Sequence, residues 1–334
     1  MTNMTRTVRT GTVANVLETA IPEWVTMRDT AVRLRKEVQR RQVDRPTIMD
    51  TSKSVSDALL AADGPADMQA VLDAARLEKH RLDAGQQDLD AIAHAMGRAE
   101  HQLRTIEEDS TDAVVTEIRG RVDKIASRVY GLRHRPLSAQ EAIELGAIDE
   151  WKVLQELAGE WQQLAAAYQT LTRHTVSGLD VSILAAAAFC DDPLANHPYM
   201  IGRRRAAAKA NVRPQARSFH EVQHAWASNA PSTQFPTDQP RGGALPMGAD
   251  PVHWITYLAD KHALVVHDPH EGIALWKAAE AATDDLTAHS AESRAVARVQ
   301  YAKLVGDDQL ETVADLRPLI EQGKRRPARG SFFG

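Results

Sequence analysis

Apolar residues spaced seven positions apart constrain this chain more than any other feature of its sequence. Further apolar residues accompany them at the companion position of the heptad. The first set is Met68, Ala75, Leu82, Leu89, Met96 and Leu103, and the companions are Val71, Ile92, Ala99 and Ile106. Six heptads in one register predict a long helix that buries this stripe against another helix, as in a coiled coil. Glu78 and Gly85 interrupt the companion set, so the seam is expected to be weak or to accept a bulkier partner helix.

The partner of this helix is expected within the same chain. A polar break at residues 108–112 is followed by a second apolar pattern, from Val115 to Leu132, in a shifted phase. Such a break fits either a hairpin turn or a stutter in one continuous helix, and the hairpin is favoured. Residues 115–132 are therefore predicted to fold back on the long helix.

More helices are predicted on both sides of this pair. Pro22 begins a helix that ends before Pro46, and the stretch from Ser138 to Glu141 has the form of a capping box. A broad apolar stripe over residues 151–171 is typical of a helix packed against several others. We therefore expect a loosely ordered N-terminus over 1–20 and an elongated helical bundle over 21–176.

The second half of the chain has a different composition. Residues 177–227 are predicted to be helical, and residues 228–251 form a loop that contains five prolines. In an enzyme such a loop would be a lid, and in a structural protein an arm on a neighbouring subunit. Residues 252–323 are predicted to hold helices and one optional β-hairpin, with strands at 254–258 and 263–266, followed by a basic tail at 324–334. The fold class is mainly α, with this β-hairpin as the only sheet.

One motif in the chain indicates a specific chemistry. His220, Glu221 and His224 match the pattern H-E-x-x-H, which on a helix lets two imidazoles bind one Zn²⁺ while the glutamate activates a metal-bound water. A catalytic zinc needs a third protein ligand, and its candidates are His253, His267, His270 or Glu271. The alternative interpretation is an amphipathic helix with both histidines at the border of its buried face.

A cluster of cations suggests a different function. Six basic residues lie within residues 203–217 with no acidic residue among them: Arg203, Arg204, Arg205, Lys209, Arg213 and Arg217. On one surface they could contact the phosphates of a nucleic acid, whereas base-specific recognition is unsupported because no recognition motif accompanies them. The alternative is a solvated helix surface or pairing with acidic residues of the bundle.

Composition limits the remaining possibilities. The formal charge of −5 over 334 residues argues against a general nucleic-acid coat. The single cysteine, Cys190, excludes an intrachain disulfide, and no apolar run is long enough to cross a membrane. These features predict a cytoplasmic protein without a membrane partner.

Three functions are therefore considered. The first is a helical structural or interaction protein that forms a homo-oligomer or docks a helical partner through the bundle, with no cofactor. The second is a zinc-dependent, peptidase-like hydrolase in which Glu221 is catalytic. The third is an accessory protein that contacts nucleic acid through the basic cluster.

Overall fold

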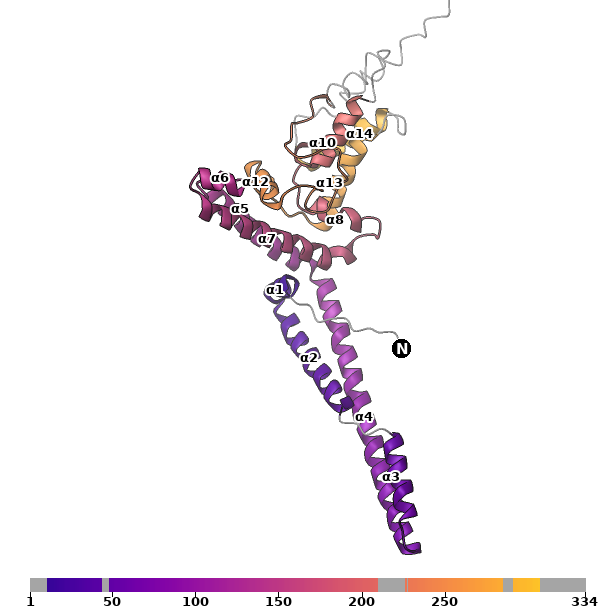
Figure 1. Cartoon of the computed structure of the whole chain (residues 1–334). Coiled ribbons are helices and arrows are strands. Elements are labelled where there is room, and N and C mark those ends of the chain that lie inside the picture. Colours follow the sequence, from indigo (N-terminus) through magenta and orange to yellow (C-terminus); the bar gives the residue numbers. More distant parts are fainter. Residues whose placement is uncertain (1–10, 44–47, 210–225, 227, 285–290, 307–334) are drawn as a thin grey trace, which may run out of the picture. The chain divides into compact units, whose positions relative to one another are not determined.

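The computed structural model describes residues 11–43, 48–209, 226, 228–284 and 291–306 (Figure 1). In this part of the chain, 77% of the residues are helical and none is in a β-strand. Thirteen α-helices and one short 3₁₀ helix account for the described secondary structure. The prediction of a mainly α fold is confirmed.

The chain divides into two compact units. Among the described residues, the first unit holds Leu17–Ser110, and the second holds Gly11–Val16 and everything from Thr111 onward. The helix α1 (Gly11–Ala20) contributes to both. The division falls at Ser110, within the polar break of the sequence and inside the predicted bundle of residues 21–176.

The first unit is an antiparallel arrangement of three helices, which we call the helical hairpin. Helices α2 (Pro22–Val43) and α3 (Ile48–Leu60) pack in turn along α4 (Pro65–Asp109), whose 45 residues extend about 68 Å. Trp24 Nε1 donates a hydrogen bond to Glu107 Oε1 at 3.1 Å, and Arg41 forms an ion pair with Asp88 at 3.1 Å. Because residue numbers rise along α2 as they fall along α4, these contacts fix the antiparallel register.

The heptad stripe of α4 faces α2 and α3, not the segment expected from the sequence. Trp24, Ala31 and Val38 of α2, again seven residues apart, are buried to 1%, 3% and 8% exposure. They cover the part of α4 that includes Leu89 and Ala99, which are also buried. Residues 115–132 pack elsewhere, so the predicted partner of the long helix was wrong. Helix α2 carries its own seven-residue spacing and supplies the apolar face that covers α4.

The second unit begins with a well-packed helical pair. Helix α5 (Thr111–Gly131) lies against α7 (Ile148–Thr172), with the short α6 (Ala139–Glu144) between them in sequence. The predicted N-cap is present, because Ser138 Oγ accepts from the Glu141 amide at 3.1 Å. The Glu141 carboxylate reaches back one residue further than in a standard capping box and accepts from the Leu137 amide at 2.7 Å. Of the 25 residues of α7, ten are buried, which confirms the broad apolar stripe predicted there.

The remaining helices surround a core rich in aromatic side chains. After the 3₁₀ turn η1 (Arg173–Thr175) come α8 (Val181–Ala188), α9 (Pro193–Asn196), α10 (Pro198–Lys209), α12 (Pro251–Asp260), α13 (Pro269–Ala282) and α14 (Ala291–Leu304). Helix α13 packs on α8 and α14, and α12 packs on α7. Gly272 permits the close approach to α8, because a Cβ there would lie 2.8 Å from the carbonyl oxygen of Ala187. Three tryptophans, Trp161, Trp254 and Trp276, are fully buried in this core.

The β-hairpin predicted around residues 254–266 is absent. Residues 254–258 belong to the helix α12, whose N-cap Asp250 accepts hydrogen bonds from the amides of Val252 and His253 at 2.9 and 3.1 Å. Residues 263–266 lie outside any helix and pair with no strand in the described chain. The signal that decides for a helix is the Asp250-Pro251 pair, because an N-cap aspartate followed by proline begins a helix.

Candidate functional site

The H-E-x-x-H motif lies outside the described residues. His220, Glu221 and His224 all belong to residues 210–225, and nothing in the described structure bears on their placement. Only the candidate third ligands can be located.

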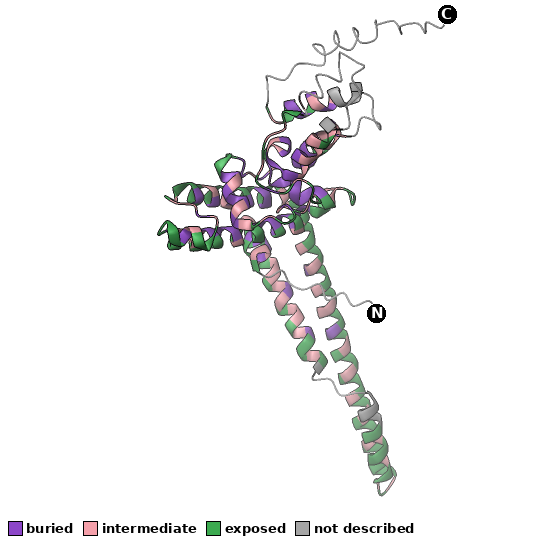
Figure 2. Cartoon of the chain, turned by 45° about the horizontal axis from the view of Figure 1, so that its top comes forward, coloured by how far each residue is buried: buried purple, intermediate pink, exposed green. Residues whose placement is uncertain are grey.

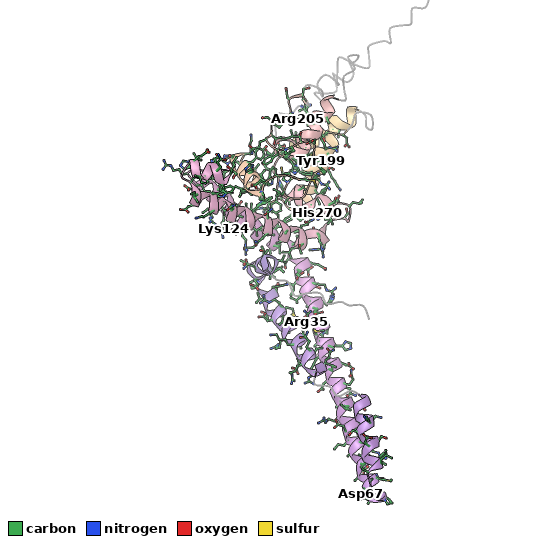
Figure 3. All side chains as sticks on the ribbon, viewed as in Figure 1. Arg35, Asp67, Lys124, Tyr199, Arg205 and His270 are labelled. Carbon is green, nitrogen blue, oxygen red and sulfur yellow. The ribbon has the colours of Figure 1, made fainter. Side chains whose placement is uncertain are left out.

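These candidate ligands do not gather into a metal site. His253 Nε2 lies 2.6 Å from the carbonyl oxygen of Leu137, and His267 Nε2 lies 3.2 Å from that of Cys190. His270 and Glu271 occupy the first turn of α13, and His270 is labelled in Figure 3. Within the described ranges, no three His, Cys, Asp or Glu side chains are placed to hold a metal ion. Two of the candidate imidazoles thus contact backbone carbonyls.

The zinc hypothesis therefore rests on the motif alone, and metal analysis tests it directly. If His220 and His224 bind zinc, the purified full chain should carry close to one zinc ion, and His220→Ala should lose it. The matched control is His101→Ala, which removes an exposed histidine that is not a candidate ligand and should keep the zinc. A wild-type chain that takes up no stoichiometric zinc, when prepared without chelators and challenged with the ion, would contradict the hypothesis.

The first three arginines of the basic cluster each bind groups of the protein itself. Arg203, at the start of the run, donates to Thr283 Oγ1 at 3.0 Å and to the carbonyl oxygen of Glu280 at 3.2 Å, and it forms an ion pair with Asp284. Arg205 donates to the carbonyl oxygen of Pro231 at 2.8 Å. These guanidinium groups tie α10 to the end of α13 and to the loop that follows residue 227.

Arg204 lies in the most buried part of this cluster. Its guanidinium donates to the carbonyl oxygen of Trp226 at 2.8 Å and lies 4.3 Å from the centre of that indole ring, and the guanidinium of Arg298 lies 5.0 Å from the same ring. Burial, together with the charge of Arg298, lowers the pKa of Arg204 to about 10. At neutral pH Arg204 stays charged, and two guanidinium groups lie against the same indole ring.

The other half of the basic cluster cannot be placed on this surface. The side chain of Lys209, and Arg213 and Arg217 entirely, lie outside what the structure describes. The three described arginines of the cluster do not form a row of outward-pointing cations. Their guanidinium groups bond to carbonyl oxygens and to one carboxylate of the protein itself. The sequence shows the charges and gives no sign of these acceptors, which come from residues 22 to 81 positions away.

The proline-rich loop packs on its own unit. Phe235 is buried and lies edge-on to Trp254 and Tyr257, with ring centres 5.4 and 5.3 Å apart. Arg241 donates to the carbonyl oxygen of Ser182 at 3.2 Å and lies 3.8 Å from the carboxylate of Glu280. These anchors fix the loop to the aromatic core at two points.

A buried histidine at the centre of this core has no counterpart in the sequence predictions. His197 is only 1% exposed, and its ring lies edge-on to Trp276 and Trp254, with centres 4.9 and 5.9 Å apart. Neither ring nitrogen has a hydrogen-bond partner among the described residues. Burial lowers the pKa of His197 to about 3, and the charge of Arg241 lowers it in the same direction. The imidazole is therefore neutral at physiological pH. Its burial affects the stability of the folded protein in acid.

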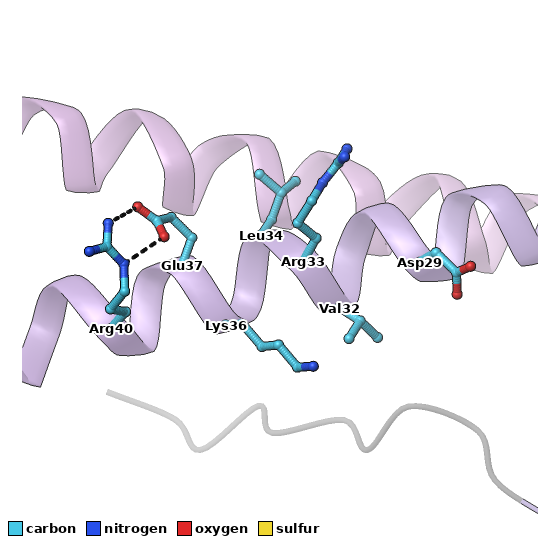
Figure 4. Close-up of a pocket in the computed structure, with 7 residues that line it drawn as sticks. All are labelled: Asp29, Val32, Arg33, Leu34, Lys36, Glu37 and Arg40. Carbon is cyan, nitrogen blue, oxygen red and sulfur yellow. Dashed lines mark hydrogen bonds and ion pairs between the residues drawn. The ribbon is translucent and has the colours of Figure 1, made fainter.

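The hollow beside α2 has the wrong character for a catalytic site. It measures about 720 Å³ and is lined by Asp29, Val32, Arg33, Leu34, Lys36, Glu37 and Arg40, all from one helix (Figure 4). The carboxylate of Glu37 accepts hydrogen bonds from Arg40 and Arg41. These bonds lower the pKa of Glu37 to about 2, and the bond from Arg40 has the larger effect. The carboxylate of Glu37 is thus paired within the helix.

One surface that remains unexplained is at the closed end of the helical hairpin, where α3 turns into α4. Large apolar side chains are exposed there: Leu60 to 84%, Met68 to 45%, Leu72 to 39% and Leu77 to 73%. We call these four side chains the tip surface. Figure 2 shows this end of the hairpin mostly as exposed residues, and Figure 3 labels Asp67 beside it.

Comparison with known proteins does not assign the chain to a family. No family model, curated protein or solved structure matches it. Within the described ranges, the structure holds no helix with the length and apolar character needed to cross a bilayer. The function must therefore be argued from the surfaces of the two units.

Proposed function

We propose that the chain is a helical scaffold protein that self-associates through its helical hairpin. The observation that carries this proposal is the incomplete burial of α4. Only Leu89 and Ala99 of its 45 residues are buried, although the apolar stripe continues toward the tip surface. Leu60 at the end of α3 and three large apolar side chains of α4 are exposed at the same end of the hairpin, and an exposed apolar group of this kind is typical of a contact with another protein.

The second unit provides the comparison that makes this observation specific. In α7 ten of 25 residues are buried, and its stripe is covered by α5, α8 and α12. The sequence therefore does build complete cores where several helices meet. Among the described helices, α2 and α3 pack most extensively on α4, and α3 lies alongside its closed end. A further helix would complete the packing.

The energy available from the tip surface supports a weak association. Burying a fully exposed leucine or methionine side chain contributes about 1.5–3 kcal/mol. Leu77 follows Met68 by nine residues on α4, which places the two on opposite sides of the helix, so a symmetric contact buries only some of the four side chains of each copy. Association costs at least about 4 kcal/mol in lost freedom, and dissociation constants of about 1 mM and 1 μM correspond to about 4 and 8 kcal/mol. We therefore expect a concentration-dependent dimer or larger oligomer with a dissociation constant between micromolar and millimolar.

Sedimentation velocity of the full chain over a concentration series tests the proposal. The wild type should shift from monomer to oligomer, and Leu72→Asp with Leu77→Asp should stay monomeric with an unchanged far-ultraviolet circular dichroism spectrum. Leu179→Asp is the matched control, because Leu179 is 89% exposed but lies in the second unit. A wild type that remains monomeric at every concentration would refute self-association.

A further inference from the structure

One face of α4, which includes Leu77 of the tip surface, lacks a partner among the described residues. Five exposed positions, Asp67, Ala70, Ala74, Leu77 and Arg81, are spaced three and four residues apart in alternation. This spacing places them on one side of a helix. The half-buried positions Val71, Glu78 and Leu82 belong to the neighbouring side, which faces α3. The face defined by the five residues, here called the outer face, contains the most exposed apolar side chain of α4, Leu77.

The charges around the outer face are segregated along the helix. Residues 65–73 of α4 include two aspartates and no lysine or arginine, whereas residues 74–81 include three lysines or arginines and one glutamate. On the outer face itself, Asp67 and Arg81 each lie seven positions from Ala74. The face therefore carries opposite charges at equal distances from its centre.

This arrangement is complementary to itself when one copy is turned end over end. We propose that the outer face binds the outer face of a second copy of this chain, antiparallel, around a two-fold axis at Ala74. The inference rests on the proposed self-association and adds its geometry. Asp67 of each copy faces Arg81 of the other, and Leu77 inserts beside Ala70 and Ala74 of the other copy, whose small side chains leave room for it.

A parallel pairing of the same faces would be unfavourable. It would set Asp67 against Asp67 and Arg81 against Arg81, and like charges placed opposite each other oppose association. Arg81 already lies 3.1 Å from Glu78 of its own helix, but its side chain is 76% exposed. A guanidinium has five N–H donors, so it can bind a second carboxylate in addition.

Charge reversal tests the pairing directly. Asp67→Arg alone and Arg81→Asp alone should each weaken association by about tenfold or more, because each creates two like-charged contacts across the axis. An equimolar mixture of the two variants should associate like the wild type, since every contact is then between opposite charges. Arg76→Asp is the matched control: Arg76 is 69% exposed and also paired within the helix, with Asp73, but it lies off the outer face.

Cross-linking gives an independent measure of the orientation. Ala74→Cys lies at the proposed axis and should form a disulfide between copies, which requires Cα atoms within about 7 Å. Ala84→Cys should not, because the two copies of residue 84 would be about 30 Å apart in the antiparallel pair. Cys190 is buried and does not compete.

The outcomes separate this inference from the proposed function. Rescue by mixing, together with cross-linking at residue 74 only, supports the antiparallel pair. Cross-linking at both residue 74 and residue 84 would show a parallel pair and overturn the inference. Oligomers that ignore both charge reversals would show that another surface is used, so that the inference fails while self-association stands. Monomeric wild type would remove both.

Discussion

Replacing Gly202 with alanine is expected to destabilise the second unit by about 2–4 kcal/mol. Gly202 lies in α10, and a Cβ at this position would meet the carbonyl oxygen of Thr237 at 2.0 Å and its carbonyl carbon at 3.0 Å. Neither atom belongs to a flexible side chain, so either the backbone of the proline-rich loop or the helix must move. The added methyl group would normally favour a helix, and here the clash outweighs that gain.

The loop has little freedom to move away from Gly202. On one side of Thr237, Phe235 is held between Trp254 and Tyr257, and on the other side Arg241 is bonded to Ser182. Both anchors lie within four residues of Thr237. A displacement that relieves the clash would therefore also disturb the aromatic core or the hydrogen bonds of Arg241.

Urea denaturation followed by tryptophan fluorescence measures this effect, because five of the six tryptophans lie in the second unit. Gly159→Ala in α7 is the matched control, since a Cβ there meets no atom within 4 Å. It should raise stability by about 0.5–1 kcal/mol through helix propensity alone. A gain in stability for Gly202→Ala like that of the control would contradict the close contact between α10 and the loop.

The second large effect is a loss of stability in acid that depends on His197. Its pKa is about 3 in the folded protein, against an ordinary value of 6.5, because burial among Trp254 and Trp276 disfavours the charged imidazolium. The unfolded chain therefore binds a proton that the folded chain does not between these two pH values. The contribution of His197 to stability is complete above pH 6.5 and is lost as the pH falls toward 3, by about 1.4 kcal/mol per pH unit.

Comparison of variants isolates this contribution from that of the carboxylates. The groups that act on the ring are Arg241, Trp254 and Trp276, and they are the same in wild type and in His197→Phe. The phenylalanine variant should lose less stability than the wild type between pH 6 and pH 4. His270→Phe alters an exposed histidine of the same unit and should leave the pH profile unchanged. Equal acid sensitivity of wild type and His197→Phe would contradict the role of His197.

The helices themselves follow from local sequence. The seven-residue spacing of α4, the capping box at Ser138 and the broad stripe of α7 were all predicted and are all present as helices or caps. Each of these signals acts within a few turns of one helix, because periodicity decides which face is apolar and caps decide where a helix begins. The type of element was misread at residues 254–258, where the helix-start signal of Asp250 and Pro251 was overlooked. It was also misread at residues 11–20, which were expected to be loosely ordered and form the helix α1, with Ala14, Val16 and Leu17 buried.

The partners of these elements depended on the tertiary structure. A heptad stripe specifies an apolar face but not which other face will cover it, so α4 packs against α2 and α3 although the pattern at 115–132 looked equally suitable. The carbonyl oxygens that bind Arg203, Arg204 and Arg205, and the tryptophans that enclose His197, lie far from these residues in the sequence. Hydrophobic burial has no direction of its own. Which groups meet is therefore decided by how the whole chain fills its core.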